Sequence, residues 1–88
     1  MDPREIDPQF FRVISMFASA CWKQLGKMPE EDGTVSKDLA GAKSTIEILL
    51  MLRNKMQGNL TGTEERLIGD TIARLQEVLE EEQDRREI

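Results

Sequence analysis

The 88-residue chain has no histidine, no tyrosine and one cysteine, Cys21. Without histidine or a second thiol, a zinc site lacks its usual ligands and an internal disulfide cannot form. A nucleophile paired with a general base cannot be assembled either, so we expect no enzyme, no cofactor and no metal. The neighbours of Cys21 are apolar and no base is present to activate it, which predicts a buried structural side chain.

Long apolar runs are also missing. The longest uncharged apolar stretch extends from Val13 to Trp22, which is about half of what a membrane-spanning helix needs. The first residues, 1–5, are polar and charged, unlike a secretory signal. Together with the single cysteine, these features predict a cytoplasmic protein that does not enter a membrane.

Basic surface is scarce, and the net charge of −5 comes from the last third of the chain. Residues 1–56 hold eight basic and eight acidic side chains, whereas residues 57–88 hold four and nine. Nucleic-acid binding needs a basic stripe that contacts phosphates, so we expect no nucleic-acid partner. The acidic segment 80–87 is either a solvated extension of the last helix or an interaction tail, and the sequence leaves this open.

What the sequence does contain is three amphipathic segments with helix start and stop signals. Because 88 residues form one domain at most, we predict a single all-α domain over residues 1–88. The link between the second and third segments is short, which favours an antiparallel hairpin of those two helices. The predicted helices cover about residues 8–25, 37–57 and 62–85.

The helix boundaries follow from particular residues. Asp7 followed by proline is typical of a cap and first turn, and Gly26 can adopt the left-handed conformation that ends a helix. Either Ser36 or Asp38 can cap the second helix. The segment 61–64, Thr-Gly-Thr-Glu, has the spacing of a capping box, which predicts that the third helix starts at its second residue.

The first two helices carry more apolar surface than a three-helix chain can bury. At about 100° per residue, the apolar arc of the third helix covers roughly 140°, that of the second about 200° and that of the first about 240°. Small monomers rarely expose large apolar patches, so we expect a homo-oligomer, with a dimer favoured. The alternative is a monomer whose loop and acidic tail fold over the extra surface. The predicted interface residues are Phe10, Phe11, Phe17, Trp22, Ile48, Leu52 and Arg53.

Arg53 is the unusual member of this set, because it projects from the middle of the apolar arc of the second helix. Its aliphatic stem can carry the charge out to solvent, or the guanidinium can meet a carboxylate across an interface. The sequence favours neither outcome.

The middle of the chain resembles a known family. The segment that carries the resemblance reads Ala42…Thr45-Ile46-Glu47…Leu49…Met51-Leu52…Lys55…Gly58-Asn59-Leu60-Thr61…Glu64-Glu65-Arg66-Leu67. With the phenylalanine-rich first helix and its Leu-Gly-Lys-Met-Pro ending, the chain is similar to the bacterial domain of unknown function 1844 family over about residues 10–80. Gly62 departs from the proline or better helix former expected there. The resemblance implies a bacterial, cytoplasmic helical protein and brings no activity, cofactor or catalytic residue.

Two functions fit these features. The first is a homo-oligomeric scaffold or protein-interaction module, whose partners are further copies of the chain and an unidentified protein. The alternative is a small-molecule-binding protein with an apolar pocket between helices of neighbouring subunits. A molecule held in the helical core would favour the alternative, whereas capture of a specific protein would favour the first.

Overall fold

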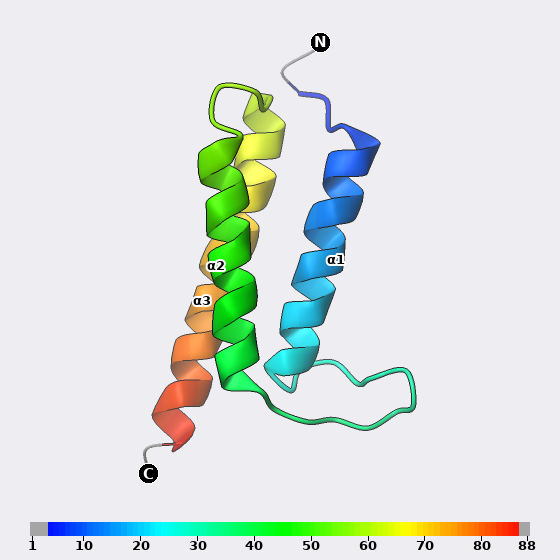
Figure 1. Cartoon of the computed structure of the whole chain (residues 1–88), viewed down its shortest axis with the longest axis vertical. Helices are drawn as coiled ribbons and strands as arrows, with labels where there is room; N and C mark the ends of the chain where they lie inside the picture. The colour runs from blue at the N-terminus through cyan, green and yellow to red at the C-terminus, as the bar shows by residue number, and fades with distance from the viewer. Residues whose placement is uncertain (1–3, 87–88) are drawn as a thin grey trace.

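The computed structural model describes residues 4–86 and contains three α-helices (Figure 1). α1 spans Pro8–Gln24, α2 spans Leu39–Lys55 and α3 spans Gly62–Arg86. Each helix contacts the other two, and the chain turns back after α2 so that α3 packs along it. The predicted all-α class is confirmed. No helix in the described part of the chain is both long and apolar enough to cross a bilayer.

Both ends of α1 form as the local sequence signals predict. The side chain of Asp7 caps its first turn. At the other end Gly26 adopts a left-handed φ of 78°. The backbone N–H groups of Gly26 and Lys27 donate to the carbonyls of Lys23 and Trp22, with N···O distances of 3.0 and 2.9 Å. This Schellman arrangement satisfies carbonyls that a helix end leaves without partners.

α2 is shorter than the range of 37–57 expected from the sequence, because it begins at Leu39 and ends at residue 55. Of the two possible caps, Asp38 is the one used, and Ser36 lies outside the helix. The Asp38 carboxylate accepts a hydrogen bond from the N–H of Gly41 at 2.9 Å. The N–H of Asp38 donates to the carbonyl of Gln24 at 2.7 Å, which fastens the start of α2 to the end of α1.

α3 begins with the predicted capping box. The Thr61 hydroxyl accepts the N–H of Glu64 at 3.1 Å, and the Glu64 carboxylate accepts the N–H of Thr61 at 2.9 Å. The same two side chains hold the segment before α1. Thr61 donates to the carbonyl of Glu5 at 2.7 Å, and Glu64 accepts the N–H of Asp7 at 2.8 Å. The hydrogen bonds from Thr61 and Asp7 keep the pKa of the Glu64 carboxyl below its ordinary value.

We predict effects of opposite sign from two substitutions at this boundary. Gly62 is the first residue of α3, where the N–H needs no intrahelical partner. Gly62→Pro should therefore raise the free energy of unfolding by about 0.4–1 kcal/mol, because proline restricts the unfolded chain. Thr61→Ala removes the cap and should lower that free energy by about 1 kcal/mol. Thermal melts check both variants. A lower melting temperature for Gly62→Pro than for the wild type would contradict the start of α3 at Gly62.

The core is one cluster of apolar side chains supplied by all three helices and by the residue that follows α1. Its centre is closed to solvent, with Leu25, Leu49, Ile68 and Leu75 at 0% exposure. The capping box closes one end of the cluster and the ion pairs described below close the other. The cluster consists of Phe10, Ile14, Cys21, Leu25, Leu39, Ala42, Ile46, Leu49, Ile68, Ile72, Leu75, Val78 and Leu79.

Candidate functional site

Within the described helices, exposed large apolar side chains occur on α1 and α2 and not on α3. This distribution agrees with the wide apolar arcs of the first two helices and the narrow arc of the third. The single chain therefore leaves part of the apolar surface of α1 and α2 in contact with water. The exposed side chains are Phe11, Val13 and Met16 on α1 and Ile48, Leu50 and Met51 on α2, with exposed fractions of 39% to 64%.

Part of this surface lies along the line where α1 and α2 meet. The Thr45 hydroxyl donates to the side-chain oxygen of Gln24 at 2.7 Å, which identifies the flanks of the two helices that face each other. Residues that lie at helical intervals from Gln24 and Thr45 share these two flanks. They are Val13 and Phe17 on α1 and Ile48 and Leu52 on α2, and we call these four residues the seam surface.

The structure distributes the predicted interface residues over different environments. Phe10 is only 8% exposed and packs in the core, because it shares a stripe of α1 with Ile14 and Cys21. It is therefore not available to a second chain in this arrangement. Phe11, the next residue, is 51% exposed. The other apolar members are the exposed Ile48 and the partly buried Phe17, Trp22 and Leu52, which pack against the core.

In the single chain the side chain of Arg53 reaches solvent, and its contact with a carboxylate across an interface stays a prediction. Its side chain is exposed, and its guanidinium lies beside Gly69 of α3. Among the described residues, Arg53 takes part in none of the ion pairs. The exposed side chain therefore leaves the charge of Arg53 in contact with water in the single chain.

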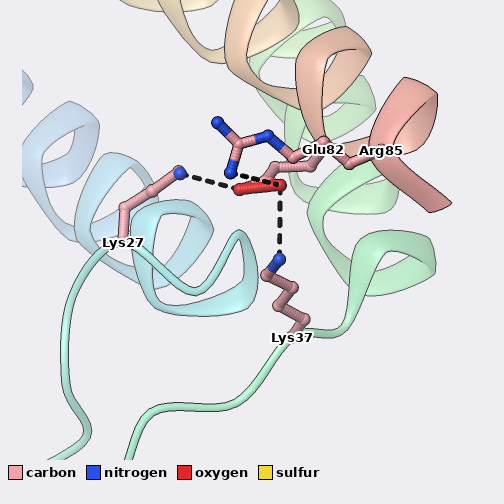
Figure 2. Close-up of polar contacts among 4 residues, drawn as sticks. All are labelled: Lys27, Lys37, Glu82 and Arg85. Carbon is pink, nitrogen blue, oxygen red and sulfur yellow. Dashed lines mark hydrogen bonds and ion pairs between the residues drawn. The ribbon is translucent and has the colours of Figure 1, made fainter.

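A buried carboxylate lies near the C-terminal end of α3 (Figure 2). Glu82 is 1% exposed, and its two carboxylate oxygens lie 2.7 Å from Lys27 Nζ and 3.3 Å from Lys37 Nζ. Arg85 is at 4.0 Å. The contact with Lys27, supported by Lys37, keeps the pKa of the Glu82 carboxyl below its ordinary value although burial acts in the opposite direction. Because the two lysines stand at either end of the loop between α1 and α2, Glu82 fastens that loop to α3.

Of the acidic segment 80–87, the structure describes the residues up to Arg86, and Glu87 lies outside the described part of the chain. α3 continues as a helix to Arg86, and Glu82 turns inward. The signal for it was its spacing from Leu75 and Leu79, which places all three on one stripe. Sequence reasoning missed it because a glutamate in an acidic run is usually solvated, and because both lysine partners come from a distant loop.

Cys21 is buried and reduced, as its apolar neighbours predict. Its thiol donates to the carbonyl of Ala42 with an S···O distance of 3.6 Å, at a contact between α1 and α2. Burial raises the pKa of the thiol to about 11, so the reactive thiolate is scarce at neutral pH. The residue fills space between two helices.

We predict that Cys21→Ala lowers the free energy of unfolding by on the order of 1 kcal/mol and leaves association unchanged. The native protein should react with a disulfide thiol reagent far more slowly than the urea-unfolded chain, because the thiol must first be exposed. The two labelling rates provide the measurement. Rapid labelling of the native protein would show that the α1–α2 contact is open.

A groove of about 960 Å³ extends along the outer face of α1. Its volume lies within the range of ligand sites, but it is open to solvent along its length and lies beside α1 rather than between α1 and α2. Among the described residues, no group of three or more His, Cys, Asp and Glu side chains could hold a metal ion. The groove is lined by Phe11, Met16, Ser15, Ser19, Arg12 and Lys23, with Glu30 and Glu31 at one end.

The family comparison agrees with the resemblance noted in the sequence. The family described as "Domain of unknown function (DUF1844)" matches residues 7–81. This range contains α1, α2, the capping box and the seam surface. Glu82 is the first residue beyond it. No curated protein and no solved structure matches the chain.

Proposed function

Since this chain belongs to the DUF1844 family, whose description assigns no activity, we propose its function from the structure alone. It acts as a homo-oligomeric scaffold or protein-interaction module whose subunits associate through α1 and α2. In this proposal the protein is not an enzyme, α2 and α3 form an antiparallel hairpin, and α3 lies on the outside of the assembly. The observation that carries the proposal is the confinement of exposed apolar helix surface to α1 and α2.

Two physical arguments support this assignment. Burial of apolar surface stabilises a complex by about 25 cal/mol per Å², and contiguous exposed apolar side chains mark interaction sites. The surface is also held in place before association. The capping box fastens the N-terminal segment to α3, and Glu82 fastens the α1–α2 loop. A preorganised surface loses less conformational entropy when it binds.

Light scattering coupled to size-exclusion chromatography tests the proposal. At tens of micromolar chain, the molar mass should be a multiple of 10.1 kDa, and a dimer is the simplest result. Ile48→Glu places a charge on the seam surface and should raise the dissociation constant at least roughly tenfold. The matched control is Ala73→Glu, which adds the same charge at an exposed position of α3. A wild-type monomer under these conditions would overturn the proposal.

The alternative function, small-molecule binding, has one observation in its favour, the volume of the groove beside α1. A ligand that occupies it should survive purification and appear in native mass spectra as a fixed mass increment per chain. Removal of that increment by Met16→Glu, which charges the groove wall, would support the alternative. An unmodified mass would count against it.

A further inference from the structure

Six exposed side chains form a face that extends across α1 and α2 on the side away from α3, which passes behind α2 in Figure 1. On each helix they follow helical spacing and stand beside a partly buried member of the seam surface, Phe17 or Leu52. None of the six is charged. We call them the α1–α2 face. It consists of Val13, Met16 and Ala20 on α1 and Ser44, Ile48 and Met51 on α2.

The side chains of the α1–α2 face change in size from one end to the other. α1 and α2 run in opposite directions (Figure 1), and the thiol of Cys21 contacts the carbonyl of Ala42. Residues at similar distances from this contact along the two helices lie at the same level and form a row. From the small end to the large end, the rows are Ala20 with Ser44, Met16 with Ile48, and Val13 with Met51.

We propose that the α1–α2 face packs against the same face of a second copy of this chain, about a two-fold axis that lies between the copies and is perpendicular to α1 and α2. The axis passes through the middle row, so Met16 and Ile48 of each copy meet their own counterparts. This inference rests on the proposed function and deepens it, because it states which side of α1 and α2 meets the partner and in which direction.

The change in side-chain size makes a second copy a matching occupant. A two-fold axis exchanges the two ends of the face, so Val13 and Met51 of one copy cover the short side chains of Ala20 and Ser44 of the other. Large residues against small ones fill the interface evenly. An axis parallel to the helices would instead pack large on large and small on small. The unfilled space at the small end would destabilise that arrangement.

The area of the face is also close to what a stable dimer needs. α1 and α2 have 17 residues each, which is about 25 Å at 1.5 Å per residue. Two helices side by side make a face about 20 Å wide. The flat footprint is therefore about 500 Å² per copy before the relief of the side chains is added, near the roughly 600 Å² per partner of the smaller stable interfaces. The second copy would cover Met16 and Met51, which are 64% and 46% exposed.

Charge neither selects nor prevents this contact. The two-fold axis brings Arg12 of one copy to the level of Lys23 of the other, and Glu47 to that of its counterpart. These pairs of like charge lie at the open rim, where water and salt screen them. Glu30 and Glu31 line the same rim as Arg12 and Lys23 and balance the two cations. The direction of the pairing therefore follows from side-chain size.

Enlargement of the small end tests this direction. Ala20→Leu places a large side chain against Val13 of the other copy, where no room is left, and should raise the dissociation constant at least roughly tenfold. With an axis parallel to the helices, the same change would fill the gap and strengthen association. The matched control is Ala73→Leu, which enlarges an exposed position of α3 and should leave the dissociation constant unchanged. Analytical ultracentrifugation gives the constants, and circular dichroism verifies that each variant folds.

Cross-linking at the middle row is a second test that does not depend on overpacking. Ile48→Cys in a Cys21→Ala background carries one accessible thiol, and a short bifunctional maleimide should join two copies through it, because the axis passes beside residue 48. A mixture of Val13→Cys and Ala20→Cys chains in the same background should give a mixed product, identified by its mass, in higher yield than either chain alone. Ala73→Cys is the control and should stay unlinked.

The outcomes separate this inference from the proposed function. A wild-type monomer at tens of micromolar would overturn both. A wild-type oligomer that Ala20→Leu does not weaken, or whose Ile48→Cys chains do not join, would overturn the pairing of the α1–α2 faces alone and would assign the oligomer to another surface. Preferential linkage of Val13→Cys chains to Met51→Cys chains would place the axis parallel to the helices and would overturn the proposed direction.

Discussion

Leu49→Ala should lower the free energy of unfolding by about 2–5 kcal/mol. Leu49 lies on α2 at 0% exposure, in the centre of the core that all three helices share. Its truncation loses buried apolar surface and leaves a cavity that close-packed neighbours fill only in part. Since domains are stable by about 5–15 kcal/mol, and small ones toward the lower end, this single change should leave a measurable unfolded fraction without denaturant.

The matched control is the next residue, Leu50→Ala. Leu50 is 39% exposed, so the same truncation removes less buried surface and should cost about 1 kcal/mol or less. Urea denaturation of both variants at low protein concentration measures the two losses. Equal losses would mean that the buried side of α2 is not the one carrying Leu49.

The double substitution Lys27→Met with Lys37→Met should have the next largest effect. It removes the two cations closest to Glu82 and leaves a carboxylate that is 1% exposed with only Arg85 at 4.0 Å. An ionised group buried without compensation destabilises the folded state strongly. The melting temperature at neutral pH should fall by several degrees. Lys43→Met, which removes an exposed lysine from α2, is the control and should have little effect.

The pH dependence of the melting temperature identifies why the double lysine variant is less stable than the wild type. In the wild type, the lysine contacts lower the pKa of Glu82, so its stabilising contribution is present above the unfolded pKa of about 4.3 and is lost as pH falls through the folded pKa. In the double variant the two lysine contacts are lost and burial, which raises that pKa, outweighs the distant Arg85, so protonation in acid relieves the variant. The difference in melting temperature should therefore be largest near neutral pH and shrink in acid. A difference independent of pH would show that the lysines act by packing and not by charge.

Glu82→Gln separates charge from shape at the same position. The amide keeps the size of the side chain but loses the charge that Lys27 and Lys37 contact. Its melting temperature should be lower than that of the wild type near neutral pH and should change less on acidification. Some acid sensitivity should remain, because hydrogen bonds also lower the pKa of Glu64 and of Asp32.

The sequence by itself determined the features that depend on residues close together in the chain. The cap at Asp7, the left-handed Gly26 and the capping box of Thr61 with Glu64 are all formed by groups a few positions apart. Such hydrogen bonds follow from residue type and spacing alone. The apolar periodicity likewise predicted three helices and showed that the first two carry surplus apolar surface.

Only the tertiary structure decided which part of the surplus apolar surface of α1 and α2 is covered. Phe10 and Phe11 stand in the same wide apolar arc, yet Phe10 is buried and Phe11 is half exposed. Arg53 is exposed although it projects from the apolar arc of α2, and its guanidinium lies beside Gly69 of α3. Glu82 is buried because two lysines reach it from a loop far away in the sequence. Periodicity defines the apolar arc of a helix, but burial within it depends on neighbours that distant segments supply, and one helix alone does not contain them.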